Sequence, residues 1–398
     1  MAGGRPGTLR ILLLVAAMDP RQGGPPRVVY GSACALARAG HQVEIATTGA
    51  PEEAAATRAA WPLLAELGVA LHMFPRVGPA VAGYSPALER ALGRDIARFD
   101  AVHVHGVWEL FFARVTRRAR SAGVRTFVSP HGMLDLWQLR RSRIKKALAL
   151  RVFGTGAMLE RADAVLYGTR DEADEARRLR LPSRAEVMPN GVDPQPPGDR
   201  AAAKAMLHQR FPQMRDWART VLFFSRIHPK KGLDILVEAF ARTAGRHPDA
   251  GLLAVAIPQD PAYEAEVRAR IDELGTERLA LATDIVGPEA RAVMAAADVF
   301  CLPSHQEGLS IAILEAMSAG LPVLITDQCH LDDLEARGAG KVVPDTIDGL
   351  TAGLETLLAV DREGLAAMGV RGREIVAAEY GWDRIAARLT ALYAGQVA

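Results

Sequence analysis

The sequence PSHQEGLSIAILEAM occupies residues 303–317 and carries the pattern that decides the fold. The apolar run Val299–Leu302 comes directly before it and predicts a buried strand, and apolar spacing predicts a helix over Ser310–Ala319. A polar loop with Glu307 joins the two. A strand, a short loop and a helix in this order are typical of a parallel sheet with crossover helices, and backbone amides at such a helix start can bind an anion.

The same alternation continues on both sides of this stretch. In the first half, strands are expected at Leu9–Val15, Gln42–Thr47, Ala101–Val104, Arg125–Ser129 and Ala164–Tyr167, and helices at Arg27–Ala39, Pro86–Arg98 and Phe153–Glu160. In the second half, further strands are expected at Thr220–Ser225, Leu252–Ile257 and Pro322–Ile325, and helices at Gly232–Thr243, Tyr263–Leu274 and over most of Thr346–Ala394. The turn-rich residues 194–198 read as a linker. The pattern predicts an α/β protein with two parallel sheets, and ligands at the carboxyl ends of the strands, in a cleft between the halves.

The composition excludes several classes of protein. The 398 residues are 49% hydrophobic and 24% charged, which excludes global disorder, collagen and a disulfide scaffold and suggests two or three domains. The formal net charge of +2 argues against a dedicated nucleic-acid binder. Cys34, Cys301 and Cys329 have no metal-ligand spacing and suit a reducing cytosol. The apolar run Ile11–Met18 is too short to cross a membrane and indicates a first strand rather than a signal peptide.

Four charged residues lie where predicted strands end or helices begin. Arg226 follows a strand and Lys231 opens a helix, so both could bring positive charge to a leaving phosphate. Glu307 and Glu315 could hold sugar and ribose hydroxyls through charge-assisted hydrogen bonds. The alternatives are solvated surface charges for the basic residues, and a capping loop with one solvated helix carboxylate for the acidic ones.

Several further segments form a recognisable set. They are Glu307 and Glu315 with seven residues between them, AMSAGLPV (316–323), VMPNGVD (187–193), FSRIHPKKG (224–232) and the turn Gly23-Gly24. Together they resemble the large retaining glycosyltransferase family 4, the group 1 glycosyltransferases similar to glycogen synthases and mannosyltransferases. The resemblance implies the GT-B fold, in which two Rossmann-like βαβ domains face a central cleft. We therefore expect an N-terminal acceptor-binding domain over residues 1–192 and a C-terminal nucleotide-sugar domain over 193–380. Residues 381–398 are expected to form a C-terminal helix that can pack back on the first domain.

The resemblance also implies roles for individual residues. Arg226 and Lys231 would neutralise the donor diphosphate. Glu307 would hold hydroxyls of the transferred sugar, Glu315 would hold the ribose, and Gly24 would offer a backbone amide to the phosphate. The implied donor-binding residues are Gly23, Gly24, Arg226, Lys231, Glu307, Gly308, Leu309, Ser310 and Glu315, and the implied catalytic residues are Arg226, Lys231, Glu307 and His131.

Histidines cluster near two predicted strands of the first half. By resemblance, His131 is the N-terminal-domain histidine close to the transferred sugar, although a lone histidine is more often a structural hydrogen-bonding residue. His103 and His105 share one face of a strand at a spacing that could suit a metal, but the sequence offers no third ligand, so we expect no metal there. Pro25 and Pro26 follow the glycine turn and remove two N–H donors from it.

The implied reaction keeps the anomeric configuration and needs neither a metal nor a cofactor, because Arg226 and Lys231 would do the work of a divalent cation. A leaving phosphate oxygen would deprotonate the acceptor on the same face. The donor is expected to be a GDP- or UDP-linked sugar. Two departures from the family lie near the nucleotide: Pro258-Gln259-Asp260 replaces a glycine-rich turn, and Leu309-Ser310 stands where an aromatic residue and a glycine are common. The sequence therefore leaves the base and the sugar undetermined.

The acceptor side carries most of the positive charge. Eleven basic residues and only one acid, Asp135, lie between Arg114 and Arg151. The residues expected to touch an anionic membrane are Arg140, Arg141, Arg143, Lys145 and Lys146. Up to Val192 the charge is 27 − 17 = +10, and beyond it 21 − 29 = −8, so the total of +2 is a cancellation. The alternative for this stretch is a solvated helix face.

The segment His131–Asp135 resembles the exopolysaccharide and lipopolysaccharide branches of the family. We therefore expect a cytoplasmic enzyme, peripheral on the inner membrane face, that extends a glycan or a polyprenyl-diphosphate-linked acceptor. A sugar-nucleotide epimerase and a non-catalytic glycan- or nucleotide-binding protein remain as alternatives. A dehydrogenase is disfavoured because the turn after the first strand is not GxGxxG. No stacking-aromatic pattern supports nucleic-acid binding.

Overall fold

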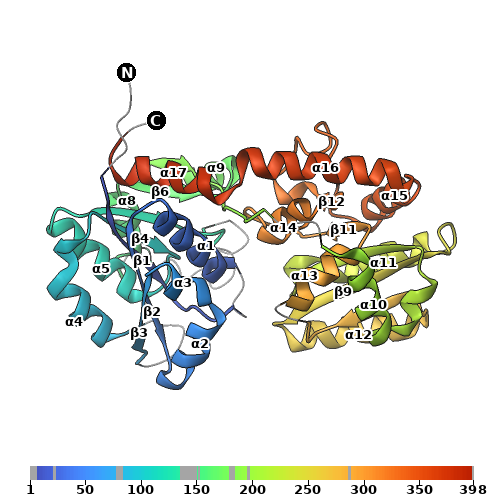
Figure 1. Cartoon of the computed structure of the whole chain (residues 1–398), viewed down its shortest axis with the longest axis horizontal. Coiled ribbons are helices and arrows are strands. Elements are labelled where there is room, and N and C mark those ends of the chain that lie inside the picture. Colours follow the sequence, from blue (N-terminus) through green and yellow to red (C-terminus); the bar gives the residue numbers. More distant parts are fainter. Residues whose placement is uncertain are drawn as a thin grey trace. The chain divides into compact units, whose positions relative to one another are not determined.

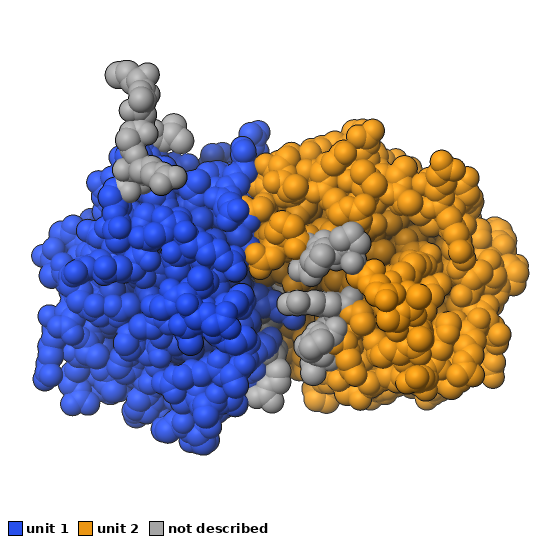
Figure 2. Space-filling view, in the orientation of Figure 1, with its two compact units in different colours: residues 1–191, 382–398 blue, residues 192–381 orange. Residues whose placement is uncertain are grey.

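The computed structural model describes residues 7–20, 24–77, 84–134, 150, 153–178, 184–194, 198–285 and 288–396. The chain forms two compact units (Figure 2). Unit 1 contains residues 1–191 together with 382–398, and unit 2 contains residues 192–381. Both are parallel-sheet α/β units, which confirms the predicted fold class (Figure 1).

Unit 1 is built on a seven-stranded sheet in the order β3-β2-β1-β4-β5-β6-β7. Its strands are β1 (Arg10–Val15), β2 (Gln42–Gly49), β3 (Ala70–Pro75), β4 (Ala101–His105), β5 (Arg125–Ser129), β6 (Ala164–Tyr167) and β7 (Ala185–Val187). Strand β1 pairs in parallel with both β2 and β4, so the strand order reverses between β1 and β4. Its residues 11–15 are all buried, as expected of a strand with helices on both faces.

The helices of unit 1 cover the two faces of this sheet. They are α1 (Gly24–Arg38), α2 (Ala54–Ala60), α3 (Pro62–Glu66), α4 (Pro86–Asp95), α5 (Leu110–Ser121), α8 (Thr155–Arg161), α9 (Arg170–Arg177) and α17 (Trp382–Tyr393). Leu12 and Leu14 of β1 share one core cluster with apolar side chains of α4, α5 and α8. The C-terminal helix α17 packs on α1. A Cβ at Gly31 of α1 would stand 2.2 Å from the Trp382 ring, so only glycine allows this close approach.

Unit 2 has a six-stranded sheet in the order β10-β9-β8-β11-β12-β13. Its strands are β8 (Arg219–Ile227), β9 (Ala250–Pro258), β10 (Leu279–Ala282), β11 (Val299–Leu302), β12 (Val323–Thr326) and β13 (Gly340–Val343). Its helices are α10 (Arg200–Arg210), α11 (Leu233–Thr243), α12 (Pro261–Leu274), α13 (Pro288–Ala296), α14 (Ile311–Ala319), α15 (Ile347–Leu358) and α16 (Arg362–Glu379). The order reverses between β8 and β11, and such a reversal is where open α/β sheets bind ligands.

The predicted strands are all present, within a few residues of their expected ends. The helix expected over Pro86–Arg98 is shorter, because the α-helix ends at Asp95 and a 3₁₀ turn, Ile96–Arg98, follows. The helix expected from Phe153 begins at Thr155, after Gly154 with a φ of 87°. In the described part of the chain, no helix is long and apolar enough to cross a bilayer.

Candidate functional site

In unit 2 the residues predicted to bind the donor gather at the carboxyl ends of β8 and β11. Arg226 is the penultimate residue of β8, and Lys231 lies in the 3₁₀ turn Pro229–Lys231 that leads into α11. Glu307 lies in the loop between β11 and α14. Because β8 and β11 are paired neighbours at the point where the strand order reverses, both loops open at the same edge of the sheet.

Lys231 and Glu307 form a buried ion pair at this edge. Lys231 Nζ donates to Glu307 Oε1, and the two side chains are only 8% and 9% exposed. Ser304 Oγ donates to the same carboxylate oxygen at 2.6 Å. A buried pair is tolerated only when further hydrogen bonds satisfy its polar atoms, and Ser304 supplies one of them.

The backbone around the pair is tightly fixed. Gly232 has a φ of 65°, and a Cβ there would stand 2.1 Å from the Pro303 carbonyl oxygen, so the turn before α11 requires glycine. The His305 amide donates to the Lys230 carbonyl at 2.9 Å, and the Glu307 amide donates to the Gln328 carbonyl at 2.9 Å. The first bond joins the β8 and β11 loops, and the second joins the β11 loop to the turn after β12, so the ion pair sits in a rigid frame.

The charges of this cluster are coupled. Burial alone would raise the pKa of Glu307, but the neighbouring Lys231 and Lys230 bring it below its ordinary value, so the carboxylate is ionised. Burial lowers the pKa of Lys231, and the positive charges of Arg226 and Lys230 act in the same direction, against the attraction of Glu307. Arg226 is therefore close enough to Lys231 to act on its charge. The cluster thus combines Arg226, Lys230 and Lys231 with the Glu307 carboxylate.

The remaining predicted donor residues lie on the same loop and helix. Gly308 and Leu309 follow Glu307 in the loop, and Ser310 is the N-cap residue of α14. Glu315 lies in the middle of α14 and is partly exposed. Unit 2 thus brings Arg226, Lys231 and Glu307 into one cluster and places Glu315 on the helix that begins beside it.

In unit 1 the first helix supplies one of the predicted backbone donors. Gly24 is the first residue of α1, whereas Gly23 lies outside the described residues. Pro25 and Pro26 occupy the next two positions of the first turn. Since proline has no N–H, only Gly24 and Arg27 among the first four residues of α1 carry a backbone N–H.

Three histidines form a second cluster, at the carboxyl ends of β4 and β5. His103 Nδ1 is hydrogen-bonded to the Tyr393 hydroxyl at 2.6 Å, and His103 Nε2 to Ser129 Oγ at 2.8 Å. His105 Nδ1 lies 3.0 Å from His131 Nε2, and these two rings stack with centroids 5.2 Å apart. The structure therefore brings His131 into direct contact with a strand residue from the neighbouring β4.

These histidines are neutral at physiological pH. Burial lowers the pKa of His103 to about 3 and that of His131 to about 4, although part of the His131 residue remains accessible. Burial also lowers the pKa of His105, helped by the neighbouring His103 and His131. Among the residues that the structure describes, buried His105 Nε2 has no hydrogen-bond partner. Within the described ranges, no group of three His, Cys, Asp or Glu side chains is arranged to hold a metal ion.

Sequence reasoning treated His103 and His105 as structural residues and did not find Tyr393 or Glu172. The i, i+2 spacing of the two histidines on one strand signalled a shared face, but nothing local pointed to α17, which carries Tyr393 from the other end of the chain. Glu172 accepts a hydrogen bond from the Gly132 amide at 2.6 Å, forty residues away in sequence. The basic residues Arg140, Arg141, Arg143, Lys145 and Lys146 lie outside the described residues.

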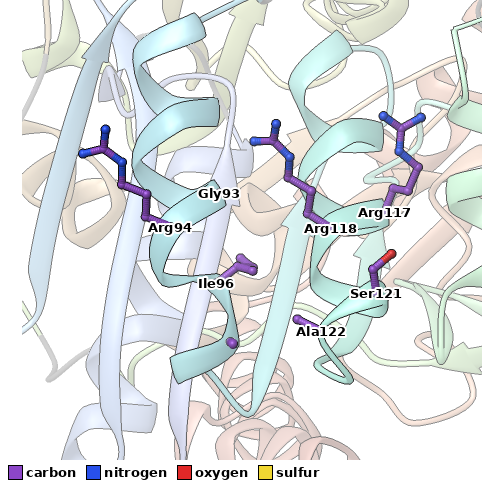
Figure 3. Close-up of a pocket in the computed structure, with 8 residues that line it drawn as sticks. Gly93, Arg94, Ile96, Arg117, Arg118, Ser121 and Ala122 are labelled. Atoms are coloured by element: carbon purple, nitrogen blue, oxygen red, sulfur yellow. The ribbon is translucent and has the colours of Figure 1, made fainter.

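A hollow of about 410 Å³ lies elsewhere on unit 1, between the ends of α4 and α5 (Figure 3). Arg94, Arg117 and Arg118 line it and extend their guanidinium groups in the same general direction. It includes Ser121, the last residue of α5, from which the chain leads to the start of β5. The hollow is thus at the amino ends of the strands, the edge opposite to His131, and arginines at helix C-termini are ordinary partners of the helix dipole.

Comparison with known proteins identifies the family. The domain described as Glycosyltransferase Family 4 matches residues 22–196, and the domain described as Glycosyl transferases group 1 matches residues 218–360. A GDP-mannose-dependent alpha-(1-6)-phosphatidylinositol monomannoside mannosyltransferase of Mycolicibacterium smegmatis is 32% identical over 290 residues, which are 70% of this chain and 72% of that protein. The chain belongs to glycosyltransferase family 4. The predicted family membership is confirmed, and the protein is a glycosyltransferase.

Further relatives and solved structures support the same family and fold. The protein of the same description from Mycobacterium tuberculosis is 29% identical over 320 residues, 76% of this chain and 78% of that one. Among solved structures, HepE of Anabaena in complex with UDP and glucose has a TM-score of 0.76 at 18% identity and covers 97% of this chain and 100% of its own. Sucrose-phosphate synthase of Thermosynechococcus elongatus has a TM-score of 0.71 at 21% identity, over 96% and 98% of the chains. At these identities the structural likeness concerns the fold, which is GT-B.

Proposed function

We propose that this glycosyltransferase moves a sugar from a GDP- or UDP-linked donor to a glycan or lipid-linked acceptor in cell-surface polysaccharide biosynthesis, with retention of the anomeric configuration. The observation that carries the proposal is the buried Lys231–Glu307 pair beside Arg226, at the strand reversal of unit 2. A cluster in which basic residues surround the ionised Glu307 carboxylate suits a ligand that carries both a diphosphate and hydroxyl groups.

Each member of the cluster has a chemical task in this proposal. Arg226 and Lys231 stabilise the negative charge that develops on the departing nucleoside diphosphate. Glu307, held ionised by its neighbours, accepts hydrogen bonds from hydroxyls of the transferred sugar. An oxygen of the leaving phosphate takes the proton of the acceptor hydroxyl as the new glycosidic bond forms on the same face. Glu315 accepts from the ribose hydroxyls.

The donor can be identified by thermal shift. Relatives at about 30% identity are named GDP-mannose-dependent, whereas HepE was solved with UDP and UDP-glucose, so both nucleotides belong in the screen. A ligand that binds only the folded state raises Tm by mass action. We expect one nucleoside diphosphate and its sugar conjugates to raise Tm, and Glu315→Gln to remove much of that shift. If no nucleotide or nucleotide sugar raises Tm at millimolar concentration, the proposal fails.

The reaction type is tested by turnover. We expect transfer to continue in excess EDTA, because Arg226 and Lys231 supply the positive charge that a divalent cation supplies in other enzymes. Nuclear magnetic resonance of the product should show the donor's anomeric configuration. Loss of all activity in EDTA with recovery in magnesium would overturn metal independence, and an inverted product would overturn retention. Donor epimerisation without an acceptor would favour an epimerase instead.

A lipid-linked acceptor fits the relatives and the charge. The relatives are named for phosphatidylinositol mannosides, and the first 192 residues carry a net charge of 27 − 17 = +10. We propose that the protein is cytoplasmic and rests on the anionic inner membrane face through Arg140, Arg141, Arg143, Lys145 and Lys146. Basic residues near such a surface contribute about 1 kcal/mol each.

Vesicle sedimentation tests this surface. We expect vesicles with 30% anionic lipid to sediment the protein at low salt, and a variant with Arg140, Arg141, Lys145 and Lys146 changed to Glu to stay in solution. The matched control changes four basic residues of unit 2 (Arg242, Arg246, Arg268 and Arg371) to Glu and should leave sedimentation intact. Failure of the unaltered protein to sediment at low salt would remove the membrane from the proposal.

A further inference from the structure

The turn that carries His131 has an uncommon backbone. Strand β5 ends at Ser129, and the chain then reverses through Pro130–Met133, closed by a hydrogen bond from the Met133 amide to the Pro130 carbonyl at 3.1 Å. Its two central residues, His131 and Gly132, both have positive φ, 52° and 73°. His131 is one of only two non-glycine residues with positive φ in the described part of the chain. Such a conformation at a non-glycine residue persists only where surrounding groups enforce it.

A buried carboxylate from the next crossover holds this turn. Glu172 is the third residue of α9 and is 6% exposed. Its Oε1 accepts from the Gly132 amide at 2.6 Å, and its Oε2 accepts from the Gly168 amide at 2.7 Å. Gly168 follows β6 directly. One carboxylate therefore ties the chain after β5 to the chain after β6 with two short hydrogen bonds, the kind that ionised acceptors make.

The local sequence alone predicts another role for Glu172. Thr169-Arg170-Asp171-Glu172 is a capping-box pattern, in which the threonine accepts from the amide of the third helical residue and the glutamate reaches back to the N-cap amide. The first half is present, since Thr169 Oγ1 accepts from the Glu172 amide at 3.1 Å. The carboxylate instead accepts from Gly168, one residue earlier, and from Gly132 in a different crossover.

We propose that Glu172 is a positioning residue for the glycosyltransferase reaction: its carboxylate clamps the Gly132 amide and so holds His131 in the left-handed turn from which its ring stacks on His105. This inference rests on the proposed place of His131 in the site. The His131 ring contacts His105, and the Glu172 clamp on the following residue fixes the backbone from which that ring extends.

The test compares three single variants of α9. Glu172→Gln keeps the shape but can accept only one of the two amides, and turns an N–H group toward the other. Asp174→Asn is the matched control, because Asp174 lies on the same helix, is exposed and forms a surface ion pair with Arg177. Thr169→Ala removes the capping bond and leaves the carboxylate clamp in place. Far-ultraviolet circular dichroism and Tm establish that each variant is folded.

The first readout is the titration of His131, followed by the imidazole resonances of histidine-labelled protein. Burial holds the pKa of His131 at about 4 in the intact protein. We expect Glu172→Gln to release the ring toward water and move this pKa upward, toward the ordinary 6.5, while Asp174→Asn and Thr169→Ala leave it unchanged. A His131 titration that is the same in Glu172→Gln and in the intact protein overturns the proposal, and so does an equal shift in Thr169→Ala, since capping would then explain it.

The second readout is turnover. We expect Glu172→Gln to lower kcat about tenfold to a hundredfold, the usual cost of a small misplacement, with little change in the donor KM. A lowered kcat in both Glu172→Gln and Asp174→Asn would also overturn the inference. If the protein turns over no nucleotide sugar at all, the proposed function fails, but the titration of His131 still decides whether Glu172 positions it.

Discussion

The Lys231–Glu307 cluster of unit 2 and the histidine cluster of unit 1 lie at corresponding places in their sheets, but the first is charged and the second is neutral. In unit 2, β8 and β11 meet at the strand reversal, and the loops after them hold the buried ion pair Lys231–Glu307. In unit 1, β4 lies at the equivalent reversal, and the buried groups at its end are His103 and His105, kept neutral. The same topology thus produces one charged cluster and one uncharged cluster.

The difference follows from what each cluster can pair with. Lys231 has a carboxylate within hydrogen-bond reach, so burial of its charge is compensated. Among the described residues, His103 hydrogen-bonds to the hydroxyls of Tyr393 and Ser129, which pair with a neutral ring without compensating a charge. A neutral histidine cluster suits the binding of hydroxyls, and a charged cluster suits the binding of a diphosphate.

Breaking the Lys231–Glu307 pair is expected to have the largest effect on stability and turnover. Lys231→Ala leaves the Glu307 carboxylate buried without its cation and should lower the free energy of unfolding of unit 2 by about 3–5 kcal/mol and abolish turnover. The double variant Lys231→Met with Glu307→Leu should recover the stability, because no buried charge remains, but not the turnover. Urea unfolding and a donor-turnover assay measure the two effects.

The exposed pair Lys341–Glu335 of unit 2 is the matched control. Lys341→Ala should cost no more than about 1 kcal/mol, as surface pairs do. Equal losses from Lys341→Ala and Lys231→Ala would contradict the contrast between a buried and a solvated pair. A double variant less stable than Lys231→Ala would do so too.

We expect the neutral histidine cluster to make unit 1 less stable in acid. The pKa of His103 is about 3 in the folded protein, below its ordinary 6.5, so the unfolded chain binds a proton that the folded chain does not as the pH falls below about 6.5. Each such histidine should lower the free energy of unfolding by about 1.4 kcal/mol at pH 5.5 relative to pH 7.5. Replacing His103 with Asn should make unit 1 less stable at pH 7.5 but less sensitive to acid.

Hydrogen exchange of the β4 and β5 amides at the two pH values measures this unit separately from unit 2. His208 of α10, in unit 2, is the control position, and its replacement should leave the acid sensitivity of β4 and β5 as it is. If His103→Asn retains the full acid sensitivity, His103 does not remain neutral below pH 6.5 in the folded protein.

The last prediction concerns α17, the helix that contributes Tyr393 to the neutral cluster. Tyr393→Phe removes the hydroxyl that pairs with His103 Nδ1 and should lower the free energy of unfolding by about 1–2 kcal/mol, since a buried nitrogen loses its partner. Thr390→Val on the same helix removes the hydroxyl bonded to His41 and serves as the comparison. Thermal unfolding measures both, and an unchanged Tm in Tyr393→Phe would show that His103 does not depend on α17.

Much of the fold followed from the sequence because parallel strands are buried on both faces. Runs such as Leu9–Val15 and Val299–Leu302 are apolar throughout, and their ends were found to within a few residues. Strands β3, β7, β10 and β13 were not predicted. All four form sheet edges, and the side chains of β3, β7 and β13 are mostly only partly buried, so the apolar patterns of these strands are weak. Residues Thr169–Glu172 match the capping-box pattern, but the Glu172 carboxylate accepts a hydrogen bond from the distant Gly132 amide instead.

The sequence by itself determined the family, the α/β class and the residues that unit 2 brings together, because Arg226, Lys231 and Glu307 follow strands that must end at one edge of a parallel sheet. Only the tertiary structure decided how these charges are paired and that His131 contacts His105. It also decided that the Tyr393 hydroxyl hydrogen-bonds to His103 and that Glu172 accepts from the turn of His131. Those contacts join residues 26 to 290 positions apart, and no local periodicity records them, because each depends on how the crossover helices and α17 pack against the sheet.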